Sequence, residues 1–345
     1  GDIMRYRGHS IPARIVIIAC AIACVPTMAR ADDSLSPRRL ALKLLQQYSP
    51  SGYYIISQYA AARTSFTCES GSVSVSKTDF SSYLRGTAPA QIAESLNTAV
   101  HEICHGYTGL LAYPAKEAAG IGACASGTYF SYYIGGTESV LVKQTPVFPT
   151  REMAASIPAR MHTLRFPTYV LASGNLGAQV NGIYGLLDEL NAYYHGTKTA
   201  FDLLTFYRTE MPQTPETWLA FFTGVNGTYY AYGEFTYYIS MYLRHAKANH
   251  PAQYREIVAN ESLKNAYAKI DRNYRDLIAA YVAAKKDILA ELARQGYSVS
   301  EDSKLLWIGK NGSRQGRGNF LDVHTRLMDE LAKDEHRTML NALRP

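Results

Sequence analysis

The chain has 345 residues and a formal net charge of +6, with 47% hydrophobic and 19% charged residues. This composition excludes a disordered chain, and the length allows one large domain or two smaller ones. The charge is mild and no dense run of Lys and Arg occurs, which argues against a nucleic-acid-binding protein. The 27 Tyr against 11 Phe favour a wet cleft or surface over a dry core.

Residues 1–31 are typical of a cleavable export signal, preceded by a short remnant, Gly1–Ile3, ahead of Met4. Basic residues come before the apolar stretch Ile15–Val25, which is too short to span a bilayer. An A-x-A cleavage site follows at Ala29–Ala31. We therefore expect a secreted or periplasmic mature chain without stable membrane insertion. A lipoprotein anchored through a cysteine of the leader is the less favoured alternative.

Three cysteines remain after the leader: Cys68, Cys104 and Cys124. An exported protein meets oxidising conditions, so one disulfide is expected. We predict the pair Cys68–Cys124, because Cys104 falls within a helix that carries the chemistry-bearing motif described below. Cys104 is then expected to be a small buried hydrophobic residue.

The first half of the mature chain reads as a mixture of helices and strands. Apolar residues at helical spacing, such as Ile92, Leu96 and Ile103, predict a helix from Pro89 that ends near Gly106. Gly135-Gly136 between two alternating runs predicts a β-hairpin. The predicted elements are a helix over 34–48, strands over 53–59 and 73–76, a helix over 89–106 and a hairpin over 128–144.

The second half reads as mostly helical. The predicted helices cover about 177–194, 197–209, 215–223, 234–248, 252–259, 262–295 and 320–342. Residues 296–318 are polar and Gly-rich, which indicates a loop. The prediction is therefore an α+β fold, in which 32–175 form an α+β part with a small sheet, 176–295 a helical part, and 296–345 a loop and a C-terminal helix.

The motif that carries chemistry is His101-Glu102-Ile103-Cys104-His105, which fits H-E-x-x-H. Residues four apart on a helix lie on the same face, so two imidazoles at this spacing can bind one metal ion. Glu102 projects beside them, where it can take a proton from a water molecule rather than bind the metal. The residues around the motif are uncharged, as a buried metal-binding helix requires.

The segment Thr98–His105 resembles the active-site helix of the zincin metallopeptidases. The metzincin branch of these enzymes has Gly and His three and six residues after the second His. This chain has Thr108 and Leu111 there, so that branch is rejected. The gluzincin branch takes its third ligand from a Glu on a helix further along the chain, and the segment 185–194 looks like that helix.

The resemblance implies one Zn²⁺ bound by His101, His105 and Glu189, with a fourth position open for water and Glu102 as general base. Three other residues stay open as third ligand: Asp188, Glu234 and His195. A second electrophile is also implied, and the candidates are Tyr193, Tyr194, His195, Tyr229, Tyr230, Tyr232, Tyr237, Tyr238 and His245.

These features predict an exported zinc metallopeptidase that acts on a peptide or protein substrate. An amidase that acts on cell-wall peptides is an alternative enzyme. An envelope protein that keeps a zincin fold and binds without turnover is the alternative outside enzymes. A latent form, with residues 32–50 as an inhibitory propeptide, is also open. The sequence does not indicate the oligomeric state.

Overall fold

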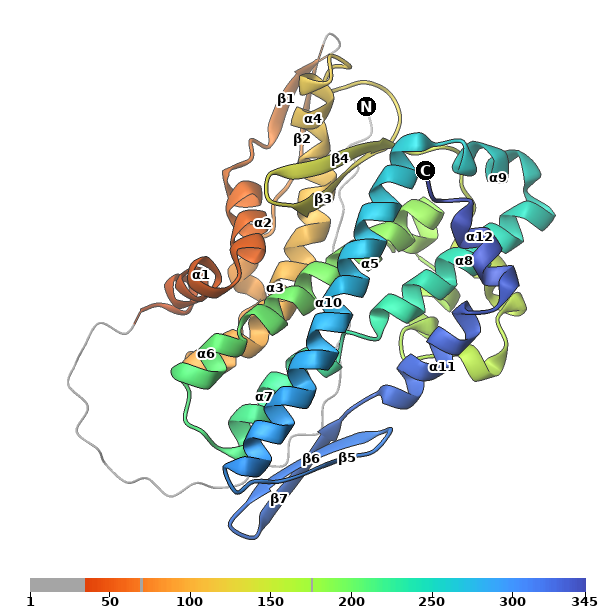
Figure 1. Cartoon of the computed structure of the whole chain (residues 1–345). Helices are drawn as coiled ribbons and strands as arrows, with labels where there is room; N and C mark the ends of the chain where they lie inside the picture. Colours follow the sequence, from red (N-terminus) through yellow and green to blue (C-terminus); the bar gives the residue numbers. More distant parts are fainter. Residues whose placement is uncertain (1–34, 69–70, 175) are drawn as a thin grey trace. The chain divides into compact units, whose positions relative to one another are not determined.

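In the computed structural model, which describes residues 35–68, 71–174 and 176–345, the first half of the chain combines helices with two β-ribbons (Figure 1). Strands β1 (Ser65–Cys68) and β2 (Gly71–Ser74) pair antiparallel, as do β3 (Tyr129–Gly135) and β4 (Glu138–Lys143). The helices are α1 (Pro37–Tyr48), α2 (Pro50–Ala61), η1 (Phe80–Tyr83, a 3-10 turn), α3 (Pro89–Leu110) and α4 (Ala112–Ala118). The helices predicted over 34–48 and 89–106 and the hairpin over 128–144 are thus confirmed.

The strand predicted over 53–59 is wrong, because these residues lie in α2. Its run of aromatic and β-branched residues has high strand propensity. However, Ile55, Ile56 and Tyr59 are buried at helical spacing, and Pro50 occupies the first helical turn, where proline is tolerated. Helix α2 packs against both α1 and α3, and this tertiary burial overrides the local preference.

The second half is mostly helical, as predicted. An irregular segment with the short helices η2 (Thr150–Ser156), η3 (Ala159–Met161) and η4 (Pro167–Leu171, a π-turn) leads into it. The α-helices that follow are α5 (Gly177–Asp202), α6 (Leu204–Thr209), α7 (Pro215–Asn226), α8 (Ala231–Asn249), α9 (Pro251–Val258) and α10 (Glu261–Arg294). Helix α5 joins residues that were expected in two helices, and it is kinked at Gly182, which has φ 52° and ψ −126°.

The loop predicted over 296–318 is wrong, because these residues form an antiparallel sheet in the order β5-β6-β7. Its strands are β5 (Ser298–Glu301), β6 (Leu305–Lys310) and β7 (Ser313–Gly318). Only the central strand buries side chains well, which explains the polar composition. Asn311 and Gly312 both have positive φ, as the tight turn of a two-residue hairpin requires, and this dipeptide was the missed signal. The final helix of the prediction is divided into α11 (Leu321–Leu331) and α12 (Asp334–Asn341).

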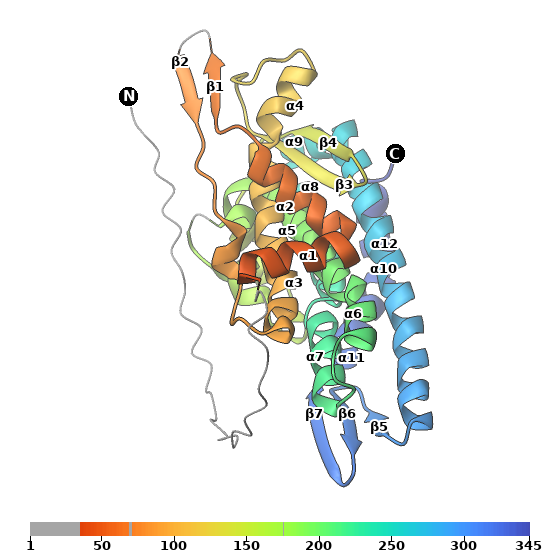
Figure 2. The same cartoon turned by 90° about the vertical axis from the view of Figure 1, so that its left-hand side faces the viewer.

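Helices α3 and α5 lie side by side at the centre of the described residues from Leu35 onward, which form one compact unit (Figures 1 and 2). The β3–β4 ribbon lies toward one end of this unit and the β5–β7 sheet toward the other. Gly196 of α5 permits the close approach, because a Cβ atom there would lie 2.8 Å from the backbone oxygen of Asn97 in α3. The fold class is therefore α+β, with small antiparallel sheets around a helical centre.

Most of the largest fully buried side chains are tyrosines, so the expectation that the tyrosine surplus serves a wet surface is wrong. Several of the buried hydroxyl groups have hydrogen-bond partners, which removes the main cost of burying them, whereas that of Tyr267 has none among the described residues. Tyr132 donates to the backbone oxygen of Tyr184 at 2.9 Å, and Tyr274 donates to that of Thr228 at 2.8 Å.

The predicted disulfide joins Cys68 and Cys124, with Cα atoms 5.7 Å apart, and Cys104 is buried and free. The expected export signal and its cleavage site lie outside the described residues. Among the helices that are described, none combines the length and apolar character needed to cross a membrane.

Candidate metal centre

Three side chains predicted as metal ligands converge between α3 and α5. Nε2 of His101 lies 3.2 Å from Nε2 of His105, so both imidazoles point to the same place. Oε2 of Glu189 lies 3.3 Å from the His105 nitrogen and 3.8 Å from the His101 nitrogen. The three groups thus present one donor atom each around a common point.

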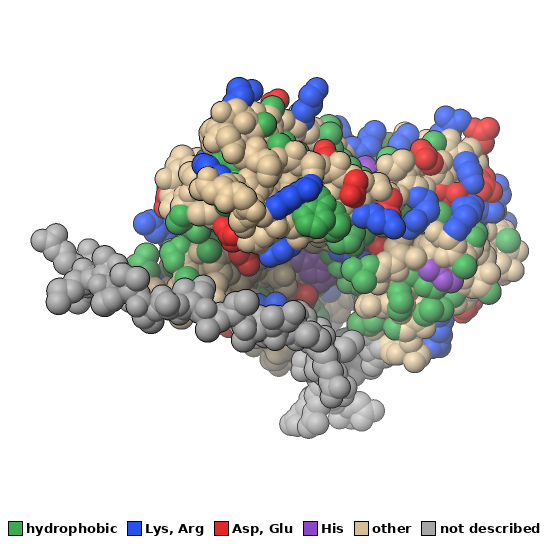
Figure 3. Space-filling view, turned by 90° about the horizontal axis from the view of Figure 1, so that it is seen from below, with side chains coloured by type: hydrophobic (Ala, Val, Ile, Leu, Met, Phe, Trp, Pro, Cys, Tyr) green, Lys and Arg blue, Asp and Glu red, His purple; other side chains and the backbone are tan. Residues whose placement is uncertain are grey.

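Helix α3 presents the motif on an accessible strip. Most of α3 is buried, and after its first residues the accessible positions recur mainly three or four apart, at Gln91, Glu94, Thr98, Glu102, His105 and Gly109, with Gly106 beside them. This spacing makes one continuous strip along the helix, and the motif lies in its C-terminal half. A hollow that exposes histidine and acidic side chains is visible on the face of the molecule in Figure 3.

Burial keeps the first imidazole neutral. It holds the pKa of His101 well below its ordinary value, and the charges of His105 and Arg165 act in the same direction. A neutral imidazole has the free nitrogen lone pair that a metal ligand needs.

The second imidazole lies beside two carboxylates. Burial alone would lower the pKa of His105, but Glu189 and Asp188 outweigh it and raise that pKa well above the ordinary value. Without a cation, therefore, the positive charge of a protonated His105 offsets part of the negative charge of these two acids. A divalent cation at the same point would replace that proton.

Asp188 has a position that the sequence did not indicate. Its Oδ2 atom lies 2.6 Å from Nδ1 of His105, on the opposite side of the ring from Glu189. Asp188 is therefore placed to accept a hydrogen bond from Nδ1–H and to leave Nε2 free, as carboxylates beside metal-binding histidines do. The alternative of Asp188 as third ligand is less well placed than Glu189.

The other two alternatives lie away from the imidazole pair. Glu234 is fully buried in an ion pair with Arg165, whose Nη1 lies 2.5 Å from Oε2 of Glu234. His195 is also fully buried, and its Nε2 lies 3.0 Å from the backbone oxygen of Tyr133. Each of these residues has a structural partner in the core.

Glu102 is half-buried on the accessible strip of α3, next to the converging ligands. Burial raises the pKa of its carboxyl group, and the charge of Glu189 adds to this while His105 opposes it. A carboxylate with a raised pKa is a stronger proton acceptor than an ordinary one.

Aromatic side chains line the centre on two sides. The ring of Tyr193, among the residues named as possible electrophiles, lies 4.3 Å from that of His101, and the Tyr169 hydroxyl lies 3.3 Å from the Tyr193 hydroxyl. The Arg165 guanidinium stacks on Tyr193 at 4.4 Å. On the Glu102 side stands Tyr83 of η1, whose pKa is raised by burial and then by the charge of Glu102. Tyr83 and Tyr169 were not foreseen, since neither is near the motif in sequence.

Comparison of the chain with models of protein families, with curated proteins and with solved structures found no match in any of the three. The chemistry of the site therefore rests on its own geometry.

The residues at this centre fit a divalent cation. Oε2 of Glu189 is buried and has no hydrogen-bond partner among the described residues, so beside the nearby His105 it lacks the hydrogen bonds that a buried carboxylate needs. Two imidazole nitrogens and one carboxylate oxygen are the donor set of catalytic zinc sites, which keep a further position open.

Proposed function

We propose that this protein is a zinc-dependent hydrolase of the zincin type that cleaves peptide bonds. The observation that carries the proposal is the convergence of His101, His105 and the unpartnered Glu189 oxygen, with Glu102 beside them. Zinc bound by these three residues would lower the pKa of a water molecule and polarise the substrate carbonyl.

The chain's own residues supply the proton transfers. Glu102 would accept a proton from the attacking water as the new C–O bond forms, and would then give that proton to the leaving amine as the C–N bond breaks. Asp188 would hold the His105 ring in place throughout. The hydroxyl groups of Tyr83, Tyr169 and Tyr193 are the nearby donors for the oxyanion.

An extended substrate has room along the strip of α3. A cavity lined by Glu94 and Thr98, and from the opposite side by Gly224 of α7 and Arg317 of β7, opens one helical turn before Glu102. This space favours a polypeptide over a small isolated amide.

The decisive variant is Glu102→Gln, tested on the zinc-loaded protein with a peptide library. We expect it to keep its zinc and to lose peptide cleavage by about 10²–10⁴-fold, because the proton acceptor is gone while the ligands remain. Glu256→Gln, at an exposed position in α9, is the matched control and is expected to cleave like the unaltered protein.

The same measurements separate the alternatives. Zinc in the unaltered protein without turnover of any peptide or amide would favour a binding protein of the envelope. Cleavage of cell-wall peptide amides but not of ordinary peptides would favour the amidase. If His101→Ala leaves zinc content unchanged, the proposed centre is wrong.

A further inference from the structure

We propose a second divalent-cation site, formed by Glu152, His245 and His250 at the corner between α8 and α9. One donor atom of each residue lies within 4.8 Å of the others. Oε2 of Glu152 is 2.9 Å from Nε2 of His250. Two imidazoles and a carboxylate suit Zn²⁺ better than the hard cations Mg²⁺ and Ca²⁺.

The end of α8 brings the two histidines together. In a continuous helix, residues five apart would point in clearly different directions. Helix α8 ends at Asn249, however, and His250 has φ −132° and ψ 58°, outside the helical region. Pro251 disfavours a helical conformation for the residue before it. The chain therefore turns at His250, and the ring centroids of His245 and His250 lie 5.7 Å apart.

A buried aromatic platform orients both rings. Phe148 stacks on Tyr242 at 4.0 Å and on His250 at 4.4 Å, and it contacts His245 at 5.2 Å. The Tyr242 hydroxyl accepts a hydrogen bond from the Phe148 backbone N–H and donates to its carbonyl, both at 2.9 Å. Because the platform is fixed by both bonds, less ordering is needed when a cation binds.

The charge around Glu152 also favours a cation. Among the described residues its only ion-pair partner is His250, so no Lys or Arg neutralises it. A third group, Glu330, Glu335 and His336, has similar spacing but different charge. There Arg160 binds Glu330 at 3.0 and 3.2 Å, and Arg244 binds Glu335 at 3.1 Å.

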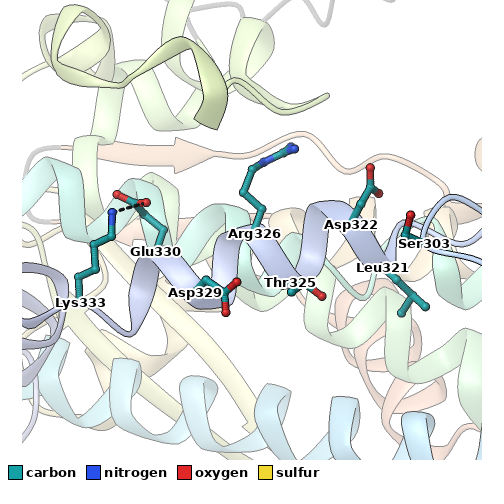
Figure 4. A pocket seen from close by; sticks show the side chains of 8 residues that line it. All are labelled: Ser303, Leu321, Asp322, Thr325, Arg326, Asp329, Glu330 and Lys333. Carbon is teal, nitrogen blue, oxygen red and sulfur yellow. Dashed lines mark hydrogen bonds and ion pairs between the residues drawn. The ribbon is translucent and has the colours of Figure 1, made fainter.

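Figure 4 shows the open pocket beside that third group. Lys333 is paired with Glu330 of α11 at 2.8 Å. Arg326, also of α11, lies among the acidic residues that line the pocket. Basic side chains thus already serve these carboxylates. The comparison leaves the α8–α9 corner as the better second site.

A cation at this corner would clamp the irregular segment to the helices. Glu152 belongs to η2, whereas both histidines belong to the α8–α9 corner. The hydroxyl group of Thr150 in η2 donates to the backbone oxygen of Tyr169 at 2.8 Å, and Tyr169 stands beside the first centre. The clamp would therefore steady one wall of the first centre without contact to its ligands.

The test is zinc titration of the full chain by calorimetry, with the first centre removed by His101→Ala and His105→Ala. We expect this double variant to bind one zinc ion, and to lose it when Glu152→Gln or His250→Ala is added. His162→Ala is the matched control, an exposed histidine outside all three groups, and is expected to leave binding unchanged.

Circular dichroism of each variant checks that the fold is kept. If His250→Ala fails to fold, the test rests on Glu152→Gln, which alters only one exposed side chain. In the chain with both histidines of the first centre intact, Glu152→Gln is expected to lower the zinc stoichiometry by one ion. Zinc should also raise the Tm of the double variant, and it should leave the Tm unchanged once Glu152→Gln is added to that variant. No zinc bound by the folded double variant, or undiminished binding after Glu152→Gln, would overturn the proposal.

Discussion

Asp188 and Glu189 are adjacent residues that approach the same histidine from different sides. Oδ2 of Asp188 faces Nδ1 of His105, whereas Oε2 of Glu189 faces Nε2. One ring is thus oriented by one carboxylate and, in the proposed centre, would share a cation with the other, as in metal sites whose histidine ligands are hydrogen-bonded to carboxylates. The pair also explains why His105, unlike His101, has a raised pKa without a cation.

For Asp188→Asn we expect zinc affinity to fall by about 10–100-fold, because the amide holds the His105 ring less firmly and no longer adds negative charge behind it. Competition with a chelator of known affinity measures this loss. Asp202→Asn, on the same helix and paired with Lys198, is the matched control and is expected to keep the affinity. Equal affinities for Asp188→Asn and the unaltered protein would contradict the positioning role.

Helix α1 is fixed to the rest of the molecule by its apolar face and by one ion pair. Ala41, Leu44 and Leu45 are buried, and Nη1 of Arg38 lies 2.5 Å from Oδ1 of Asp79. Asp79 also caps η1, because it accepts hydrogen bonds from the backbone and hydroxyl groups of Ser81. These contacts place α1 in the core rather than in a separate segment.

The hydrogen bonds from Ser81, together with Arg38, lower the pKa of Asp79. A carboxyl group with a lowered pKa in the folded state stabilises the fold above its unfolded pKa, and this contribution disappears as pH falls through the folded value. We therefore expect Asp79→Asn to lower the urea midpoint at neutral pH and to have little effect in strong acid. Unfolding curves over a pH series provide the measurement.

Asp287→Asn, at an exposed position of α10, is the control for that series and should leave the midpoint nearly unchanged at every pH. A loss of stability in Asp79→Asn that persists undiminished in strong acid would show that the carboxylate charge is not the cause.

Across the whole molecule, buried tyrosine hydroxyl groups join helix α10 to the elements around it. Tyr281 donates to the side chain of Asn226 at 2.5 Å, and Tyr232 donates to Asp271 at 2.8 Å. Such bonds fix how the helices sit against one another, because each buried hydroxyl group is costly without its partner. At the β1–β2 ribbon, by contrast, the covalent Cys68–Cys124 link holds the structure.

The disulfide bridges 56 residues of chain, so its loss frees a long loop in the unfolded state. We expect Cys68→Ser with Cys124→Ser to lower the free energy of unfolding by about 2–4 kcal/mol, measured by urea denaturation. Reduction of the unaltered protein should give a similar loss, and no loss in either experiment would contradict this role.

The sequence alone was sufficient for the features that depend on short spacing. The imidazole pair of His101 and His105, the hairpin around Gly135 and most helices follow from periodicities of two or 3.6 residues, which are set within one element. The proposed third ligand, Glu189, was named only by resemblance, because its meeting with α3 depends on how two helices pack, including the close approach at Gly196. The helical state of residues 53–59, Asp188 behind His105 and the Glu152 group all depend on burial or on contacts between distant segments, which no local pattern encodes.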